Sequence, residues 1–183
     1  MLQQDYLFPW RLIYENAVIG LELQGKRTPE NEQYVDHLLE EMGPFSNNHD
    51  SPAQLSGGMR QRVALVRTLA TKPDYMLLDE PFSALDYQTK LQLEDLVAET
   101  LKAHKKTALL VTHDISEAIA MSDRVIVLEP SPGLIRRQVT IPPEIRSLLP
   151  FSARDQAGFQ RLFQEIWQEF EDMRVRGGCP DGG

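Results

Sequence analysis

The sequence predicts an α/β fold with a parallel sheet at its core and a separate helical part. Three short apolar runs, at residues 75–78, 108–111 and 124–128, show no alternation of apolar and polar side chains. Such runs are typical of strands buried on both faces, as in a parallel sheet. Helical stretches separate the runs, at residues 89–103 and from Asp114 onward. Strands that alternate with helices are typical of an α/β domain.

The residues before the first run predict loop and helices. Apolar residues at helical spacing predict a first helix, and they are Leu12, Ala17, Val18, Leu21 and Leu23. A second helix is predicted to begin at Thr28-Pro29-Glu30, because proline is favoured at the first helical position. Its apolar face comprises Val35, Leu38, Leu39 and Met42. A turn-rich break over residues 43–52 follows.

The residues after the third run predict a turn at 130–133 and a strand over 134–141 that returns antiparallel. A last amphipathic helix is predicted over residues 152–173, with one apolar stripe that is expected to pack in the core. The stripe consists of Phe159, Leu162, Phe163, Ile166 and Phe170. Residues 174–183 are expected to form a frayed tail.

Composition narrows the possible functions. The net charge of -8 argues against a general nucleic-acid binder, which normally has a basic face. No apolar run approaches the ~18 residues that cross a bilayer, and the single cysteine, Cys179, fits a reducing cytosol. Any membrane contact is therefore expected to go through a partner. Arg60, Arg62 and Arg67 recur along one predicted helix and are interpreted as a solvated face.

Two places in the sequence indicate nucleotide chemistry. Asp79, Glu80 and His113 follow predicted strands, and ligands of open α/β sheets bind beyond the carboxyl ends of the strands. A carboxylate for Mg²⁺, a second carboxylate to orient water and an imidazole near a phosphate suit nucleotide hydrolysis, although the carboxylates also fit capping of the next turn. Elsewhere, Ser56-Gly57-Gly58 at a helix start would favour an anion, because exposed N–H groups point outward there.

These segments resemble the motifs of ABC ATPases. Residues 54–62, which read Gln-Leu-Ser-Gly-Gly-Met-Arg-Gln-Arg, resemble the signature motif, and residues 75–81 resemble the Walker B strand. Residues 83–86 match the D-loop, His113 matches the switch histidine, and residues 3–10 resemble the Q-loop with Gln3 at its key position. On these motifs, which occur in family order, the chain is identified as a member of the family. The expected fold is a partial P-loop NTPase (ABC ATPase) fold.

The resemblance implies a role for each strand-end residue. Asp79 would hold Mg²⁺ through water, and Glu80 would be the general base that polarises the attacking water. His113 would contact the γ-phosphate of ATP. Gln3 would sense Mg²⁺ and the water while linking the site to the helical part.

The resemblance also implies a head-to-tail dimer with a second ATP-binding subunit. Ser56, Gly57 and Gly58 would touch the γ-phosphate of ATP held by the opposite subunit, with Gln61 of the same motif among the cofactor-binding residues. Asp86 would connect the two sites. The expected cofactors are therefore ATP and Mg²⁺.

Three functional parts are expected along the chain. Residues 1–52 would carry the Q-loop and the helical subdomain. Residues 53–141 would carry the signature motif, Walker B strand, D-loop and switch histidine of the ATPase core. Residues 142–183 would form a C-terminal helix and tail.

The phosphate-binding loop of P-loop enzymes, G-x-x-x-x-G-K-[ST], has no true match in the sequence. Residues 20–26 come near it, but Arg27 replaces the hydroxyl residue and the stretch follows a predicted helix. In the family this loop precedes the Q-loop, so an N-terminally truncated copy or a misplaced start is expected. Such a chain alone would bind ATP very weakly, be inactive as an ATP hydrolase and expose apolar surface.

Further segments resemble importers of the nitrate/sulfonate/taurine type, namely residues 7–10, 122–128, 130–133 and 163–167. This resemblance implies an ATP hydrolase that drives uptake of a small solute from the cytoplasmic face of the membrane. Its partners would be an integral permease, which docks near Phe8 and Trp10, and indirectly a solute-binding protein. A truncated remnant that only binds partners is the alternative. A DNA-repair or translation ATPase of the same superfamily is disfavoured, because only two modest helices separate the Q-loop from the signature motif.

Overall fold

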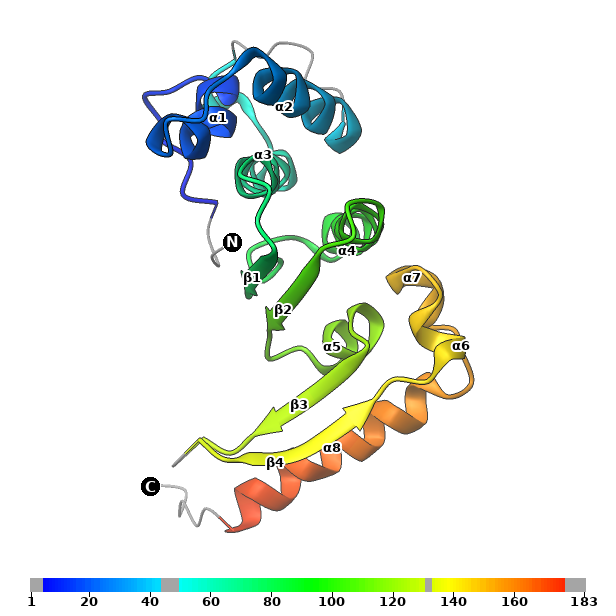
Figure 1. The fold of residues 1–183 in the computed structure, drawn as a ribbon. Helices are drawn as coiled ribbons and strands as arrows, with labels where there is room; N and C mark the ends of the chain where they lie inside the picture. The colour runs from blue at the N-terminus through cyan, green and yellow to red at the C-terminus, as the bar shows by residue number, and fades with distance from the viewer. Residues whose placement is uncertain (1–4, 44–49, 131–132, 177–183) are drawn as a thin grey trace. The chain divides into compact units, whose positions relative to one another are not determined.

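The computed structural model describes residues 5–43, 50–130 and 133–176, and Figure 1 shows their helices and strands. The chain divides into two compact units, on either side of the bond between Val111 and Thr112. None of the helices in the described ranges is long and apolar enough to cross a membrane.

The first unit begins with the helical part. Helices α1 (Ile13–Leu23) and α2 (Pro29–Met42) both pack on α3 (Gly57–Ala70), and a short 3-10 turn, η1 (Pro52–Gln54), precedes α3. Both helices predicted before the first strand are confirmed. The residues of the apolar face predicted for α2 are all buried, namely Val35, Leu38, Leu39 and Met42.

Local capping explains where α2 begins. The Oγ1 atom of Thr28 accepts a hydrogen bond from the backbone N–H of Asn31 at 3.3 Å, and Pro29 occupies the first helical position. Leu23, one of the apolar residues that predicted the first helix, is the last residue of α1 and is 83% exposed.

A parallel strand pair completes the first unit. Strands β1 (Tyr75–Asp79) and β2 (Thr107–Val111) pair in parallel, with Asp79 opposite Val111, and α4 (Tyr87–Ala103) connects them. This β–α–β arrangement confirms the predicted parallel pairing for the first two of the three apolar runs.

Burial of the strands on both faces was predicted, and this is wrong for the described residues. On β1, Met76 and Leu78 are buried whereas Leu77 is 64% exposed. On β2, Leu109 and Val111 are likewise exposed. The physical reason is that one face of this two-stranded sheet is covered and the other is not. The expected exposure of apolar surface is confirmed on this face.

The second unit pairs its strands differently. Strands β3 (Arg124–Leu128) and β4 (Ile135–Thr140) are antiparallel, with Val125 opposite Val139. The predicted antiparallel return is confirmed. The prediction that the third apolar run is a parallel strand buried on both faces was wrong, because β3 pairs antiparallel with β4 and its residues are alternately exposed and buried. Antiparallel neighbours need only a short connection, whereas parallel neighbours need a long crossover.

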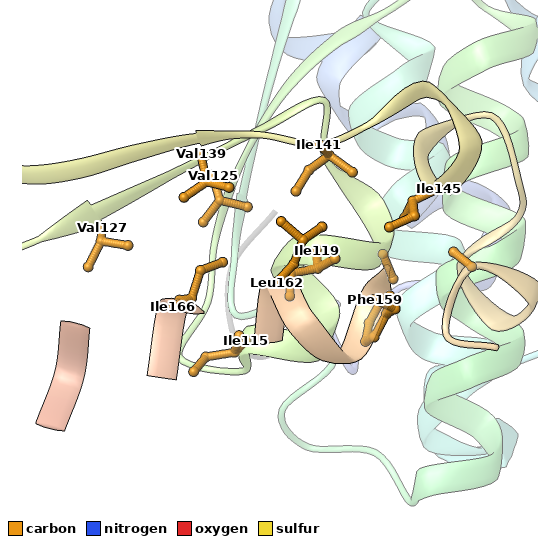
Figure 2. Packing of buried hydrophobic residues seen from close by; sticks show 12 residues of the cluster. Ile115, Ile119, Val125, Val127, Val139, Ile141, Ile145, Phe159, Leu162 and Ile166 are labelled. Carbon is orange, nitrogen blue, oxygen red and sulfur yellow. The ribbon is translucent and has the colours of Figure 1, made fainter. Parts of the chain in front are cut away.

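The core of the second unit lies between this ribbon and its helices. Figure 2 shows apolar side chains of α5 (Ile115–Met121) and α8 (Phe159–Arg176) facing those of β3 and β4. Two short helices, α6 (Pro143–Arg146) and α7 (Pro150–Ala153), contact α5. The labelled core side chains are Ile115, Ile119, Val125, Val127, Val139, Ile141, Ile145, Phe159, Leu162 and Ile166.

The single helix predicted over residues 152–173 is in fact two helices. Helix α7 ends at Ala153 and α8 begins at Phe159, because hydrogen bonds from Asp155 N to Ser152 O and from Gln156 N to Ala153 O close a turn between them. The predicted apolar stripe is buried at Phe159, Leu162 and Ile166, partly buried at Phe163 and 39% exposed at Phe170. Helix α8 continues to Arg176, three residues into the predicted tail, and residues 177–183 lie outside the described ranges.

Candidate functional site

The carboxyl end of β1 presents two carboxylates, as the sequence predicts. Asp79 is the last residue of β1 and is exposed, and Glu80 follows it with a positive φ of 43°. A non-glycine residue in the left-handed region costs about 1–3 kcal/mol, so its surroundings must hold it there. The backbone N–H of Glu80 donates to the carbonyl of Val111, at 2.8 Å, which ties this turn to the end of β2.

The segment after Glu80 is an ordered turn. Ser83 donates to the Glu80 carbonyl from its backbone N–H at 3.3 Å and from its hydroxyl at 3.0 Å. The Phe82 side chain is completely buried and anchors the turn. The turn ends at Asp86, which caps α4 by accepting the backbone N–H of Thr89 at 3.0 Å. Hydrogen bonds from the backbone and the side chain of Thr89 lower the pKa of Asp86, so this carboxylate is charged at neutral pH.

The start of α3 carries the Ser-Gly-Gly sequence. Ser56 is exposed, and its Oγ atom accepts the backbone N–H of Met59 at 3.3 Å, which caps the helix. Gly58 is buried, and a Cβ atom there would lie 2.5 Å from Cγ2 of Thr89. A Cβ atom at Gly57 would lie 3.4 Å from Cδ2 of Leu85. The structure therefore brings the predicted signature motif and the predicted D-loop together.

Gln61 lies one turn further along α3 and is only 3% exposed. Its Oε1 atom has no hydrogen-bond partner among the described residues. Of the residues expected to bind the cofactor in this motif, Ser56 is thus the exposed one, whereas Gly58 and Gln61 are buried.

His113 follows the end of β2 by two residues and is the second residue of the second unit. Its side chain is exposed, in the turn before α5. This turn is stabilised locally, since Thr112 Oγ1 accepts the backbone N–H of Asp114 at 3.0 Å. Asp114 in turn caps α5 by accepting the backbone N–H of Ser116 at 2.8 Å. Gln3, the predicted Q-loop residue, lies outside the described residues.

The interpretation of three arginines of α3 as a solvated face was wrong. Arg60 forms an ion pair with Asp5, with 3.0 Å between Nε and Oδ2. Arg67 donates from its two terminal nitrogens to the carbonyls of Tyr6 and Asp5, at 2.9 and 2.7 Å. Arg62 donates to the carbonyl of Met42 at 2.8 Å. The seven-residue spacing of Arg60 and Arg67 is close to two helical turns and places both on one side of α3. This spacing could have indicated that the two arginines contact the same segment.

Asn16 was also missed by the sequence analysis. It is completely buried on α1, where its Oδ1 atom accepts the backbone N–H of Phe8 at 2.7 Å. Its Nδ2 atom donates to the carbonyls of Phe8, Arg11 and Leu12. Asn16 therefore fixes the loop that carries Trp10, which is 76% exposed and lies with its ring centroid 5.2 Å from that of Phe8.

The donor set at the end of β1 fits Mg²⁺ held together with a nucleotide. Among the described residues no group of three or more His, Cys, Asp and Glu side chains has the arrangement of a metal site. Mg²⁺ usually keeps several waters and takes one or two carboxylates together with phosphates. The exposed carboxylate of Asp79 is a ligand of that kind, and the capped N-terminus of α3 offers N–H groups to an anion.

Comparisons with known proteins agree with the ABC ATPase motifs predicted from the sequence. A family model described as ABC transporter matches residues 1–83. The chain is 54% identical, over 173 residues, to the ABC transporter ATP-binding protein YtlC of Bacillus subtilis, covering 94% of this chain and 66% of the relative. It is 39% identical, over 163 residues, to the aliphatic sulfonates import ATP-binding protein SsuB of Burkholderia pseudomallei, covering 88% of this chain and 48% of the relative.

A solved structure has a similar fold. The chain resembles the ATP-binding cassette MJ0796, in a dimeric post-hydrolysis state bound to ADP and Pi, with a TM-score of 0.62 and 31% identity. The match covers 76% of this chain and 61% of that one. The chain thus spans between about half and two thirds of the length of the proteins it matches.

Proposed function

Because the chain belongs to the ATP-binding domains of ABC transporters, we propose that it acts in an importer that uses ATP hydrolysis to take up a small solute. The similarity to aliphatic sulfonate and taurine import proteins favours a sulfonate, the chemical class that includes taurine, over nitrate, which the sequence also leaves open. The protein would work at the cytoplasmic face of the membrane, bound to an integral permease and supplied indirectly by a solute-binding protein.

The observation that carries this proposal is the strained turn at the end of β1. Glu80 is held in the left-handed region by its hydrogen bond to the Val111 carbonyl, directly after the exposed Asp79. Backbone strain of this kind is concentrated at functional sites. Bound Mg²⁺ would neutralise charge on the phosphates, and Asp79 would hold it through water. Glu80 would accept a proton from the attacking water, with His113 and Gln3 contacting the γ-phosphate side.

Turnover would require two copies of the subunit. Ser56 is exposed at the N-terminus of α3, and this helix end favours an anion such as a γ-phosphate held by the opposite subunit. The charged Asp86 lies in the segment against which α3 packs, and it would connect the two sites. The dimeric state of the related cassette MJ0796 supports this arrangement.

The loop around Trp10 is the proposed docking surface for the permease. Its aromatic pair, Phe8 and Trp10, is held by the buried Asn16 on α1, so the exposed ring is presented from a fixed backbone. Exposed aromatic side chains are enriched at protein interfaces.

The chain would have three functional parts. Residues 1–52 would form the Q-loop and helical subdomain, residues 53–141 the ATPase core and residues 142–183 the C-terminal helix and tail.

The test uses a version of the protein that also carries the phosphate-binding loop, assembled with its permease in liposomes. Glu80→Gln keeps the size of the side chain but removes the basic oxygen, so hydrolysis of ATP is expected to fall about a hundredfold or more. ATP binding, measured with a fluorescent analogue, is expected to stay within about twofold, because the phosphates are held by other groups. Glu99→Gln on the exposed face of α4 is the matched control and should leave both quantities unchanged.

Two results would contradict the proposal. Hydrolysis by Glu80→Gln at the wild-type rate would remove Glu80 as the base. Absence of ATP binding by the folded version that carries the phosphate-binding loop and Glu80 would remove the ATPase function itself and favour a protein that binds its partners without turnover.

A further inference from the structure

The C-terminal end of α4 is bonded to α2 through one imidazole ring. Nε2 of His104 lies 3.1 Å from Oε2 of Glu41, and Nδ1 of the same ring lies 3.3 Å from the hydroxyl oxygen of Tyr34. Tyr34 and Glu41 are seven residues apart on α2, close to two helical turns, so both lie on one side of that helix. We call Tyr34, Glu41 and His104 the α2–α4 latch.

Both ring nitrogens of His104 have a partner in this latch. A carboxylate only accepts hydrogen bonds, so in the neutral ring Nε2 carries the proton and donates to Glu41. Nδ1 then accepts the hydroxyl of Tyr34. Burial raises the pKa of Tyr34, and the negative charge of Glu41 raises it further, which keeps this hydroxyl protonated and able to donate. The three side chains thus form one continuous chain of hydrogen bonds between α2 and the end of α4.

The end of α4 that carries His104 is an ordered turn. His104 is the C-cap of the helix, and Lys105 after it has a positive φ of 50°. The backbone N–H of Lys106 donates to the carbonyl of Leu101 at 2.9 Å, which closes the helix end around the left-handed residue. The imidazole is therefore presented to α2 from a backbone that its own hydrogen bonds hold in place.

The turn between α3 and β1 also holds Tyr34. Nζ of Lys72 lies 4.8 Å from the centroid of the Tyr34 ring and bonds Oδ1 of Asn31 at 3.0 Å. The ring of His104 meets the Tyr34 ring edge-on, with the centroids 6.0 Å apart. Both kinds of contact with an aromatic ring are favourable. Lys72 lies three residues before β1 and His104 three residues before β2, so Tyr34 joins α2 to the segments that lead into both strands.

A second histidine bonds the same carboxylate without joining two elements. Nε2 of His37 lies 3.3 Å from Oε1 of Glu41, but both residues belong to α2 and the His37 side chain is 61% exposed. The His104 side chain is only 17% exposed. Opening the latch would leave the ring nitrogens of His104 without their partners in a largely buried position, which is unfavourable. The bonds of His104 are therefore the ones that hold α2 to α4.

We propose that the α2–α4 latch fixes the helical part to the strand pair, and that His104 is a positioning residue for the response of hydrolysis to the permease. The inference rests on the proposed function, in which the permease contacts the loop around Trp10 and hydrolysis takes place at the carboxyl end of β1. Asn16 bonds this loop to α1, and α1 packs against α2. A displacement of the loop would therefore reach α2, and the latch would carry it to the segments before β1 and β2.

The first measurement is the distance between spin labels on α2 and α4, in the version that carries the phosphate-binding loop. Gln33→Cys and Glu99→Cys place the labels at exposed positions, in a Cys179→Ser background. Double electron–electron resonance gives the distribution of this distance. The width of the distribution reports how firmly α2 is held to α4.

His104→Ala is expected to broaden this distribution about twofold or more, because both of its bonds to α2 are lost. His37→Ala is the matched control, since it removes a bond to the same Glu41 within α2 only, and it should keep the wild-type distribution. Should His104→Ala not fold, Tyr34→Phe carries the same test. It removes one hydroxyl and keeps the ring, so its effect is smaller and in the same direction.

The second measurement is ATP hydrolysis by the same version of the protein, with and without the permease in liposomes. His104→Ala should lower the stimulation by the permease about threefold or more, while hydrolysis without the permease stays within about twofold of wild type. His37→Ala should keep the wild-type stimulation. A residue with a merely structural role would change both rates alike and leave their ratio unchanged.

The inference is overturned if His104→Ala keeps the wild-type distance distribution, or if its stimulation by the permease equals that of His37→Ala. If the version with the phosphate-binding loop and His104 does not hydrolyse ATP, the proposed function fails, and the spin-label distance still tests the latch. If that version hydrolyses ATP and responds to the permease, and His104→Ala responds equally, the inference alone fails.

Discussion

Gly58 of α3 and Thr89 of α4 approach so closely that a Cβ atom at position 58 would lie 2.5 Å from the Thr89 methyl group. The first turn of α3 and the first turn of α4 are therefore in direct backbone-to-side-chain contact. The sequence explained Gly58 by the approach of a ligand. The structure adds the packing of two helix starts as an independent reason for the glycine at this position.

Gly58→Ala is expected to destabilise the first unit by about 1–3 kcal/mol, because the inserted methyl group overlaps Thr89 in a buried contact. The measurement is urea-induced unfolding followed by circular dichroism. Gly57→Ala is the neighbouring control. Its Cβ atom would make an ordinary contact of 3.4 Å with Leu85, so its stability should change by less than about 0.5 kcal/mol.

Thr89→Ser tests the cause directly. It removes the methyl group but keeps the hydroxyl group and the backbone N–H that bonds Asp86. The Gly58→Ala/Thr89→Ser double variant should therefore recover most of the lost stability. If the double variant instead loses as much stability as the two single variants together, Thr89 is not the group that excludes a side chain at position 58.

Asn16→Ala is expected to lower the free energy of unfolding by ~2 kcal/mol or more. The backbone N–H of Phe8 and the carbonyls that accept hydrogen bonds from the Asn16 amide would lose their partner. In a Trp167→Phe background Trp10 is the one remaining tryptophan, so its emission reports on this loop. Asn31→Ala removes an amide of the same kind that bonds Lys26 in an exposed position, and it should change stability little. Equal losses in the two variants would contradict the special role of Asn16.

The ion pairs between β4 and α8 predict a pH dependence in the second unit. Arg137 and Arg136 hold the pKa of Glu169 below its ordinary value of 4.5, with hydrogen bonds of 2.8 and 2.7 Å. A carboxylate with a lowered pKa in the folded state stabilises the fold above its unfolded pKa. That stabilisation is lost as the pH falls through the lower, folded value.

Glu169→Gln should therefore be less stable than wild type at neutral pH, and the difference should shrink as the pH falls below 4.5 and through the lower, folded pKa of Glu169. The measurement is urea unfolding followed by Trp167 emission in a Trp10→Phe background. Glu171→Gln is the control on the same helix, since Glu171 pairs only locally with Arg174 at 3.4 Å, and it should show little difference at any pH. A constant difference between Glu169→Gln and wild type across this range would exclude linkage to Glu169.

The one-sided burial of the parallel pair predicts unequal costs of truncation. Leu78→Ala should destabilise by about 2–5 kcal/mol, because Leu78 is 2% exposed and its removal leaves a cavity. Leu109→Ala, at a site that is 56% exposed on the paired strand, should cost less than about 1 kcal/mol. Denaturant midpoints of the two variants measure the difference. Similar costs would mean that the second face of the sheet is also covered in solution.

The sequence predicted those parts of the fold and site that depend on neighbouring residues. Thr28 and Asp114 were recognised as helix starts because capping involves atoms within three residues of the chain. Asp79 and Glu80 were placed at a strand end because a run of apolar residues stops there. The boundary between α7 and α8 was missed, because the composition of residues 152–173 is compatible with a continuous helix.

By itself the sequence determined the order of the motifs, the helical character of the first part and the two carboxylates after β1, since each depends on local spacing and chemistry. Only the tertiary structure decided that the arginines of α3 hold Asp5 and Tyr6, that Gly58 meets Thr89, and that β1 is covered on one face. These contacts join residues far apart in the chain, such as Tyr6 and Arg67. They arise from the packing of whole elements, and no local pattern specifies which distant surface an element will meet.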